Sequence, residues 1–258
     1  MAFTPRTPRV VAARRLQRRR DRDQSGRFLV EGPQAVREAL AGGVVLELFG
    51  TATALAHHPE LVAQAPRASA VTDEALAALA ETVHPQGLVA VCERVDVPLA
   101  EALAKRPRLV AVVAEIRDPG NAGTVLRTAD AAGAGTVIFA GEAVDPYNGK
   151  CVRASAGSLF HVDVVRTPLD VIDDLRRSGL QVLATTGYGC DDLDSLLDDG
   201  VLAAPTAWLF GSEAHGLPES LLGAADRRVR VPIYGGAESL NLAAAAAVCL
   251  YASARAQR

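Results

Sequence analysis

Residues 109–140 read LVAVVAEIRDPGNAGTVLRTADAAGAGTVIFA, and this stretch decides the fold class. The apolar runs at 109–114 and 136–140 are typical of short strands buried on both faces. Between them, residues 124–132 are helix-compatible and end at Gly133. Strands without polar alternation, separated by a helix, predict an α/β fold with a parallel sheet covered on both faces.

The same rhythm continues on both sides of this stretch. Toward the C-terminus we expect strands at 158–165, 181–185 and 207–210, with helices at 169–177 and 240–255. Toward the N-terminus, a smaller α/β unit is expected, with strands at 28–30, 44–49 and 87–92 and helices at 14–22, 34–40 and 75–80. Residues 94–108, which contain Pro98 and Pro107, are the expected linker. The sequence thus predicts two domains, residues 1–105 and 106–258.

Composition excludes several classes of protein. The chain has 258 residues, 49% hydrophobic and 22% charged, which is ordinary for globular domains and of a length typical of about two of them. No apolar run reaches the roughly 18 residues of a membrane span, and the N-terminus lacks a secretory signal. The five histidines show no metal-ligand spacing, so no metal site is expected. A cytoplasmic location is predicted from four widely spaced cysteines, Cys92, Cys151, Cys190 and Cys249.

Charge is distributed unevenly along the chain. Residues 1–27 contain nine arginines against Asp21 and Asp23, a local net charge of +7. Because the total is −3, the remainder carries about −10. A basic arm on an acidic body favours a polyanionic partner, while a merely solvated helix is the alternative that charge alone leaves open. We call this set the basic arm: Arg6, Arg9, Arg14, Arg15, Arg18, Arg19, Arg20, Arg22 and Arg27.

The loop after the strand at 109–114 is a candidate for chemistry, because parallel sheets bind ligands beyond the carboxyl ends of their strands. Gly120 and Gly123 allow a tight turn, Asn121 is a candidate N-cap, and Arg127 could hold a phosphate. A capped helix with a surface arginine is the plainer interpretation of this loop alone. Neither the dinucleotide-binding pattern G-x-G-x-x-G nor a phosphate-binding P-loop pattern occurs, which argues against a nucleotide-dependent metabolic enzyme.

Two later loops also follow predicted strands. In LFGSEAHGLP (209–218), Gly211 would let backbone groups touch a flat ligand, and Glu213 could accept hydrogen bonds; His215 is more often a simple loop residue than a base. In VPIYGGAESLN (231–241), Ser239 or Asn241 could cap the final helix. Because that helix is nearly all small or apolar, we expect it to be buried, and polar groups at its N-terminus could form an anion or ligand site.

Together the three loops resemble the SpoU/TrmH family of 2′-O-ribose RNA methyltransferases, within the SPOUT superfamily. The shared patterns are N-x-G-x-x-x-R, G-x-E-x-x-G-[LM] and [IV]-P-[IM]-x-G-x-x-x-S-L-N, in this order, over residues 109–258. VRASAGSLFH (152–161) is similar to a further segment of the family. RFLVEG (27–32) resembles, less specifically, the N-terminal RNA-binding domain of rRNA-modifying members.

The resemblance implies a SPOUT domain with a trefoil knot, S-adenosylmethionine as cofactor, and a homodimer with sites at the knot interface. It implies cofactor contacts at Gly211, Val231 and Leu240, with Ile233 and Thr185 nearby. Around the reacting ribose it implies a second group of residues: Asn121, Arg127, Glu213, Ser239 and Asn241. Within this group, Arg127 either helps to remove the 2′-hydroxyl proton or orients the phosphate and stabilises the alkoxide.

The expected function is therefore S-adenosylmethionine-dependent 2′-O-methylation of ribosomal RNA, of the large subunit, for modification or for antibiotic resistance. The N-terminal domain and the basic arm would bind the RNA. Transfer RNA is the alternative substrate, and a non-catalytic RNA-binding or ribosome-assembly factor is the alternative from another class. The presence of all the polar motif residues argues against the non-catalytic alternative.

Overall fold

The computed structural model describes residues 2–258 and divides the chain into two compact units. The first unit runs to Val95 and also includes residues 145–160, and the second comprises residues 96–144 and 161–258. The sequence predicted one boundary near residue 105. The structure instead divides the chain at residue 96 and assigns part of the second half to the first unit, so unit 1 is built from two separate stretches.

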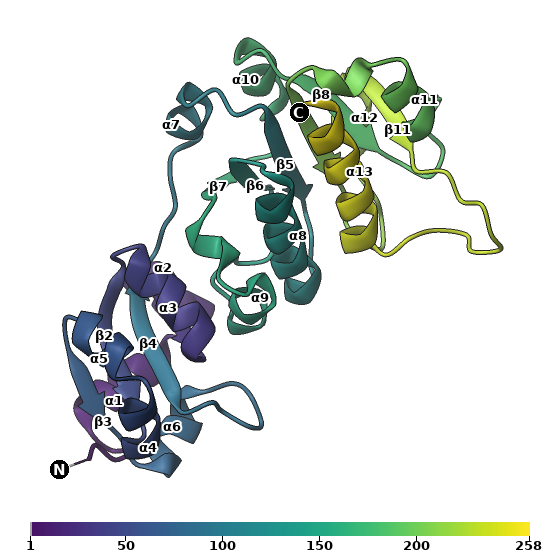
Figure 1. Cartoon of the computed structure of the whole chain (residues 1–258). Helices are drawn as coiled ribbons and strands as arrows, with labels where there is room; N and C mark the ends of the chain where they lie inside the picture. Colours follow the sequence, from purple (N-terminus) through teal and green to yellow (C-terminus); the bar gives the residue numbers. More distant parts are fainter. Residues whose placement is uncertain (1) are drawn as a thin grey trace. The chain divides into compact units, whose positions relative to one another are not determined.

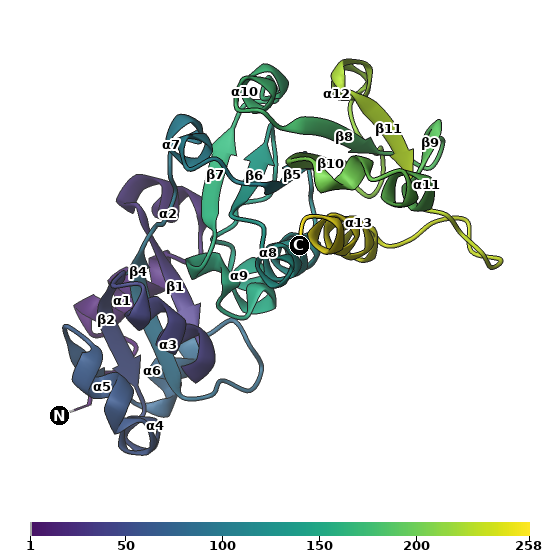
Figure 2. The same ribbon diagram turned by 45° about the horizontal axis from the view of Figure 1, so that its top comes forward.

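Unit 1 contains four strands, β1 (Arg27–Glu31), β2 (Val45–Gly50), β3 (Ala68–Ala70) and β4 (Leu88–Glu93). They form a mixed sheet in the order β1-β4-β2-β3, in which β4 is antiparallel to β1 and β2 while β3 is parallel to β2 (Figure 1 labels β2, β3 and β4, and Figure 2 labels β1). Its helices are α1 (Pro8–Arg15), α2 (Arg19–Ser25), α3 (Pro33–Ala41), α4 (Ala52–His57), α5 (Pro59–Gln64), α6 (Asp73–Leu79) and α9 (Gly149–Ser155), with a 3-10 turn at Ser158–Phe160.

The basic arm forms two helices where the sequence predicted one at 14–22. α1 ends at Arg15, and Arg18 is extended (φ −95°, ψ 132°) before α2 begins. Val10, Ala13 and Leu16 are buried in the core of unit 1 and fix α1 there. The single-helix prediction was wrong because the apolar positions that anchor the arm stop at Leu16, after which only polar residues follow as far as the αL residue Gly26.

Unit 2 contains a seven-stranded sheet, formed by β5 (Leu109–Ala114), β6 (Thr136–Ala140), β7 (Asp163–Thr167), β8 (Gln181–Thr185), β9 (Asp191–Asp192), β10 (Thr206–Phe210) and β11 (Arg227–Arg230). The order is β7-β6-β5-β10-β8-β11-β9, and every neighbouring pair is parallel. The predicted α/β class with a parallel C-terminal sheet is confirmed, and β5, β6 and β8 have the predicted bounds.

Helices cover both faces of this sheet, as Figure 2 shows. On one face, α7 (Leu99–Ala104), α10 (Ile172–Arg177) and α12 (Glu219–Ala224) contribute to a core with alternate residues of the strands. On the other, α13 (Leu242–Ala256) packs against β10 and against α8 (Pro119–Ala132), and Trp208 Nε1 donates a buried hydrogen bond to Ser253 Oγ (2.9 Å). The remaining elements are α11 (Leu193–Asp198) and a 3-10 turn at Val201–Ala203.

Three predictions for the stretch from residue 94 onward differ from the structure. The expected linker contains α7, because Ala102 and Leu103 are buried in the core and Val97 N–H donates to Val164 O (3.0 Å). The strand expected at 158–165 is a 3-10 turn followed by β7, and the helix expected from 169 begins at Ile172.

Candidate active site

Four adjacent strands of unit 2, β5, β10, β8 and β11, are parallel, so the loops that follow them share one edge of the sheet. A pocket of about 470 Å³ lies at this edge, within the 300–1,000 Å³ typical of small-molecule sites. Its lining includes all five residues expected to contact a cofactor: Thr185, Gly211, Val231, Ile233 and Leu240.

Gly211 brings two backbone segments into contact at the floor of this pocket. A Cβ atom at this residue would lie 2.1 Å from the carbonyl carbon of Gly216 and 2.2 Å from the nitrogen of Leu217. Ser212 and Gly216 exchange two backbone hydrogen bonds (3.0 and 2.9 Å), and Gly216 has a positive φ of 68°. A side chain at Gly211 would therefore open the loop 211–218.

The loop after β8 is held against β11. Thr186 N–H donates to Val229 O (2.9 Å), and a Cβ at Gly189 would lie 2.5 Å from Arg228 O. Thr185 Oγ1 donates to the carbonyl of Leu209 (2.8 Å), which ties β8 to β10 beside the pocket. The strand that leads into loop 231–241 is therefore fixed by direct backbone contact.

The loop 231–241 itself is mostly exposed. Tyr234 is 85% exposed, and its hydroxyl donates to Asp194 of α11. That hydrogen bond raises the pKa of Tyr234 above its ordinary value. Ile233 and Leu240 line the pocket while keeping more than a third of their surface accessible.

A chain of hydrogen bonds joins three of the loops. Asn121 Nδ2 donates to Glu213 Oε1 (2.7 Å), and Asn241 Nδ2 donates to Asn121 Oδ1 (3.2 Å). Asn241 Oδ1 in turn accepts from the backbone of Ala243 (2.9 Å) at the start of α13. These hydrogen bonds fix the loops after β5, β10 and β11 relative to one another. They do so at the pocket, because Glu213 and Asn241 belong to its lining.

Two capping predictions have different outcomes. Asn121 was a candidate cap, but α8 begins five residues earlier than predicted, at Pro119, and Asp118 accepts from the backbone of Asn121 (2.8 Å) as its N-cap. The Asp-Pro pair at the start of the helix was the signal that could have located this cap. At α13 two caps were considered, Ser239 and Asn241, and Asn241 is the one observed.

The remaining predicted residues are not drawn into this network. Ser239 lines the pocket and is exposed. Arg127 is exposed on α8 and is not part of the pocket lining, and its side chain has no hydrogen bond or ion pair within residues 2–258. His215 is exposed and outside the lining, and its backbone N–H contacts Ser212 Oγ (3.3 Å). Glu238 and Ser212, which sequence reasoning did not select, also line the pocket.

The pocket is suited to a cationic ligand with a flat ring. The carboxylates of Glu213 and Glu238 lie in its lining, together with apolar side chains and the close backbone at Gly211. Across residues 2–258, no group of three or more His, Cys, Asp or Glu side chains is placed to hold a metal ion.

Two protein-family models match this chain. The model of the SpoU rRNA Methylase family matches residues 108–251, and that of the MRM3-like substrate binding domain matches residues 7–90. Among curated relatives, 23S rRNA (guanosine(2553)-2'-O)-methyltransferase RlmP of Bacillus subtilis is 36% identical over 108 residues. This match covers 42% of each chain, so it spans less than half of that relative's length.

Solved structures resemble nearly the whole chain. The AdoMet-bound rRNA methyltransferase from Sinorhizobium meliloti is 30% identical with a TM-score of 0.85, covering 99% of this chain and 97% of that one. The SpoU methyltransferase AviRb from Streptomyces viridochromogenes, in complex with AdoMet, is 30% identical with a TM-score of 0.84, covering 97% and 98%.

Proposed function

We propose that this chain, which belongs to the SpoU rRNA Methylase family, methylates the ribose 2′-hydroxyl of ribosomal RNA. The observation that carries the proposal is the pocket at the edge of the parallel sheet, where Asn121, Glu213 and Asn241 are joined by hydrogen bonds. Two curated relatives are named as 23S rRNA 2′-O-methyltransferases, which favours large-subunit RNA as the substrate.

S-adenosylmethionine is the proposed cofactor, and it supplies an electrophilic methyl group on a sulfonium. The chain's residues fit it. Gly211 and Gly216 expose backbone groups beside apolar Val231 and Leu240, and the carboxylate of Glu213 complements a cationic ligand. A trefoil knot, in which the C-terminal chain passes through a loop, is proposed from membership of this family.

The residues around the pocket then have distinct parts in methyl transfer. Glu213 is held by Asn121, so its second carboxylate oxygen is free to orient a ribose hydroxyl. Asn241 joins this pair to α13 and keeps the loops from separating. Arg127 lies on the same helix as Asn121, and we assign it to the substrate phosphate and the developing alkoxide, because a guanidinium stays protonated.

RNA binding is assigned to unit 1, whose residues 7–90 match a substrate binding domain. Two members of the basic arm are not available for phosphates: Arg22 is buried beside Asp145, and Arg9 pairs with Glu47. The proposed phosphate contacts are the exposed arginines of the arm that form no ion pair within residues 2–258, and several of them lie on α1, on α2 or in the turn between these helices. The full set is Arg6, Arg14, Arg15, Arg18, Arg20 and Arg27.

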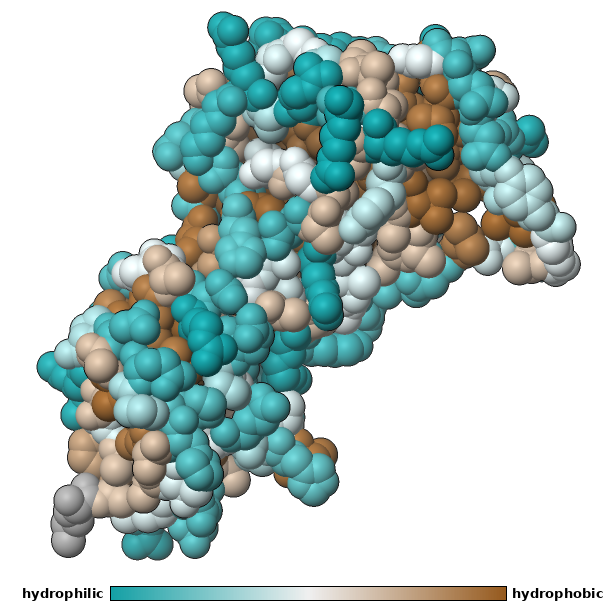
Figure 3. All heavy atoms as spheres, in the orientation of Figure 1, coloured by the Kyte–Doolittle hydropathy of each residue, from teal (hydrophilic) through white to brown (hydrophobic). Residues whose placement is uncertain are grey.

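A homodimer through α13 is also proposed. The sequence predicted a buried final helix, but one face is open: Val248 is 43% exposed and Tyr251 54%, and Ala244 lies on the same stripe. Figure 3 shows apolar surface gathered around this part of unit 2. A second copy seated there would cover this stripe.

Val248→Glu is expected to convert the dimer to a monomer, because a carboxylate would be buried without a partner in an apolar interface. Light scattering coupled to gel filtration measures the change in mass. Val83→Glu is the matched control, since Val83 is 89% exposed in unit 1 and should leave the mass unchanged. A wild-type protein that is monomeric at micromolar concentration would contradict the dimer.

The enzymatic proposal is tested by incubating the protein with labelled S-adenosylmethionine and unmodified ribosomal RNA, followed by digestion and identification of the methylated nucleosides. A 2′-O-methyl nucleoside is the expected product, and its base identifies the target type. Transfer to tRNA alone would retain the chemistry and replace the substrate. Cofactor binding without transfer to either RNA would favour the non-catalytic RNA-binding alternative.

A cytoplasmic location is proposed with this function, since ribosomal RNA is met there. Within residues 2–258, no helix is both long and apolar enough to cross a membrane.

A further inference from the structure

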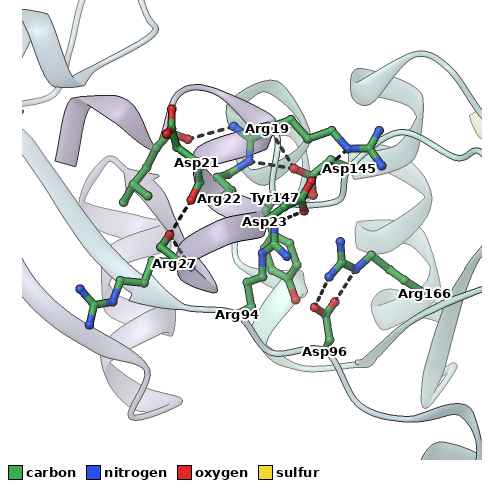
Figure 4. A network of polar contacts seen from close by, with 12 residues as sticks. Arg19, Asp21, Arg22, Asp23, Arg27, Arg94, Asp96, Asp145, Tyr147 and Arg166 are labelled. Atoms are coloured by element: carbon green, nitrogen blue, oxygen red, sulfur yellow. Dashed lines mark hydrogen bonds and ion pairs between the residues drawn. The ribbon is translucent and has the colours of Figure 1, made fainter. Parts of the chain in front are cut away.

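A buried ion pair connects the basic arm to the second stretch of unit 1. The side chains of Arg22 and Asp145 are each 3% exposed. Arg22 Nε and Nη2 both contact Asp145 Oδ2, at 2.8 and 2.7 Å (Figure 4). Asp145 Oδ1 accepts from the backbone of Tyr147 (3.0 Å). Residue 145 is distant in sequence from the arm, yet its carboxylate neutralises the arm's one buried arginine within residues 2–258.

The same guanidinium fixes the turn between α1 and α2. Arg22 Nη1 donates to the carbonyls of Leu16 and Gln17, both at 2.9 Å. From the other side, Gln17 Nε2 donates to the carbonyls of Ala78 and Leu79 at the end of α6, both at 3.1 Å. The turn at residues 16–18 is therefore held by side chains on two sides, and its carbonyl groups do not face water unpaired.

This turn determines where the exposed arginines project. Arg14 and Arg15 form the last turn of α1, Arg18 lies in the turn, and Arg20 is in the first turn of α2. All four are exposed. Phosphates along RNA are regularly spaced, so a cation contributes fully to binding only where the protein holds it at a matching position.

We infer that Arg22 and Asp145 are positioning residues for RNA binding, which hold the α1–α2 turn so that Arg14, Arg15 and Arg18 contact successive phosphates of the substrate. The inference rests on the proposed function of unit 1. It assigns no RNA contact to Arg22 itself, which is buried, and it gives residues 145–160 a part in substrate binding although they belong to the second half of the chain.

The substitution Asp145→Asn tests the inference through the sign of its effect. It removes one negative charge, so long-range electrostatics alone would tighten RNA binding. If Arg22 and Asp145 position the arm, the reverse is expected, and the Kd for ribosomal RNA should rise roughly tenfold. The salt slope, which is the slope of the logarithm of the binding constant against the logarithm of the salt concentration, should fall by more than one phosphate contact. Filter binding measures both quantities. Asp73→Asn, an exposed carboxylate of unit 1, is the matched control and should bind RNA at least as tightly as wild type.

A charge-conserving change separates position from charge. A lysine at residue 22 would retain the cation but not the planar fork that holds two carbonyls and a carboxylate, so Arg22→Lys should reduce the salt slope. Arg37→Lys, at an exposed position of α3, should leave the salt slope unchanged. The KM for RNA should rise about tenfold in Asp145→Asn, with kcat at saturating RNA and the Kd for S-adenosylmethionine within twofold of wild type.

If Asp145→Asn fails to fold, Gln17→Ala gives the same test from the other side of the turn, since it removes two hydrogen bonds and no charge. Wild-type RNA affinity and salt slope in the folded variants would overturn the inference. Arg14→Ala with Arg18→Ala tests the premise: unchanged RNA affinity there would remove the arm from RNA binding and the inference with it. Methyl transfer by that variant would still support the enzymatic proposal.

Discussion

Gly211→Ala is expected to lower the affinity for S-adenosylmethionine by about 10- to 100-fold, an effect equivalent to roughly 1.4–2.8 kcal/mol. The added Cβ would lie 2.1–2.3 Å from backbone atoms of Gly216 and Leu217. Because backbone atoms cannot rotate away, the loop must open and the paired hydrogen bonds between Ser212 and Gly216 must lengthen. This distortion is confined to the floor of the pocket, so cofactor binding should be lost while the sheet remains folded.

Calorimetric titration with S-adenosylmethionine measures this loss, and thermal unfolding reports the remaining stability. Gly223→Ala is the matched control: it lies on α12, where a Cβ has no neighbour closer than 4.0 Å, and alanine is the better helix former there. Wild-type cofactor affinity in Gly211→Ala would show that the backbone contact at Gly211 does not form the cofactor site.

The sequence was sufficient for those parts of the fold that follow from apolar patterning. β5 and β6 are continuous runs of buried residues, β8 has a buried centre between Gln181 and Thr185, and the limits of all three were predicted without error. The family resemblance, which rested on three loops, is confirmed by the family match over residues 108–251. The predicted cofactor residues came from the family resemblance, and they line one pocket because their loops follow neighbouring parallel strands.

The sequence was insufficient where long-range polar contacts decide the structure. Arg22 is indistinguishable by sequence from its exposed neighbours, because only the fold brings Asp145 to it. The membership of residues 145–160 in unit 1 is likewise a tertiary fact. The proline-bracketed stretch 94–108 suggested a linker, yet Leu103 is buried and makes α7 part of the core. The roles of the predicted site residues remain predictions.

Arg127→Ala is expected to reduce kcat by ~10²–10⁴-fold, the range for losing a group that assists proton removal or stabilises developing charge. Arg127 is exposed, outside the pocket lining, and without an ion pair within residues 2–258, so neither stability nor the Kd for S-adenosylmethionine should change. Single-turnover methyl transfer to ribosomal RNA at saturating cofactor measures the effect. Arg177→Ala, an exposed helical arginine of α10, is the control and should retain full activity.

Arg127→Lys distinguishes the two roles considered for this residue. If the guanidinium removes the 2′-hydroxyl proton, lysine, with an ordinary pKa of about 10.4, should be the better base, and the rate should rise steeply as pH approaches that value. If Arg127 orients the phosphate and stabilises the alkoxide, lysine keeps the charge but loses the bidentate fork. Activity should then be partly restored above Arg127→Ala, with the pH profile of the wild type. We expect this second outcome, because an arginine remains protonated throughout the working range. Full turnover by Arg127→Ala would exclude both roles and place the chemistry on Glu213 and the residues bonded to it.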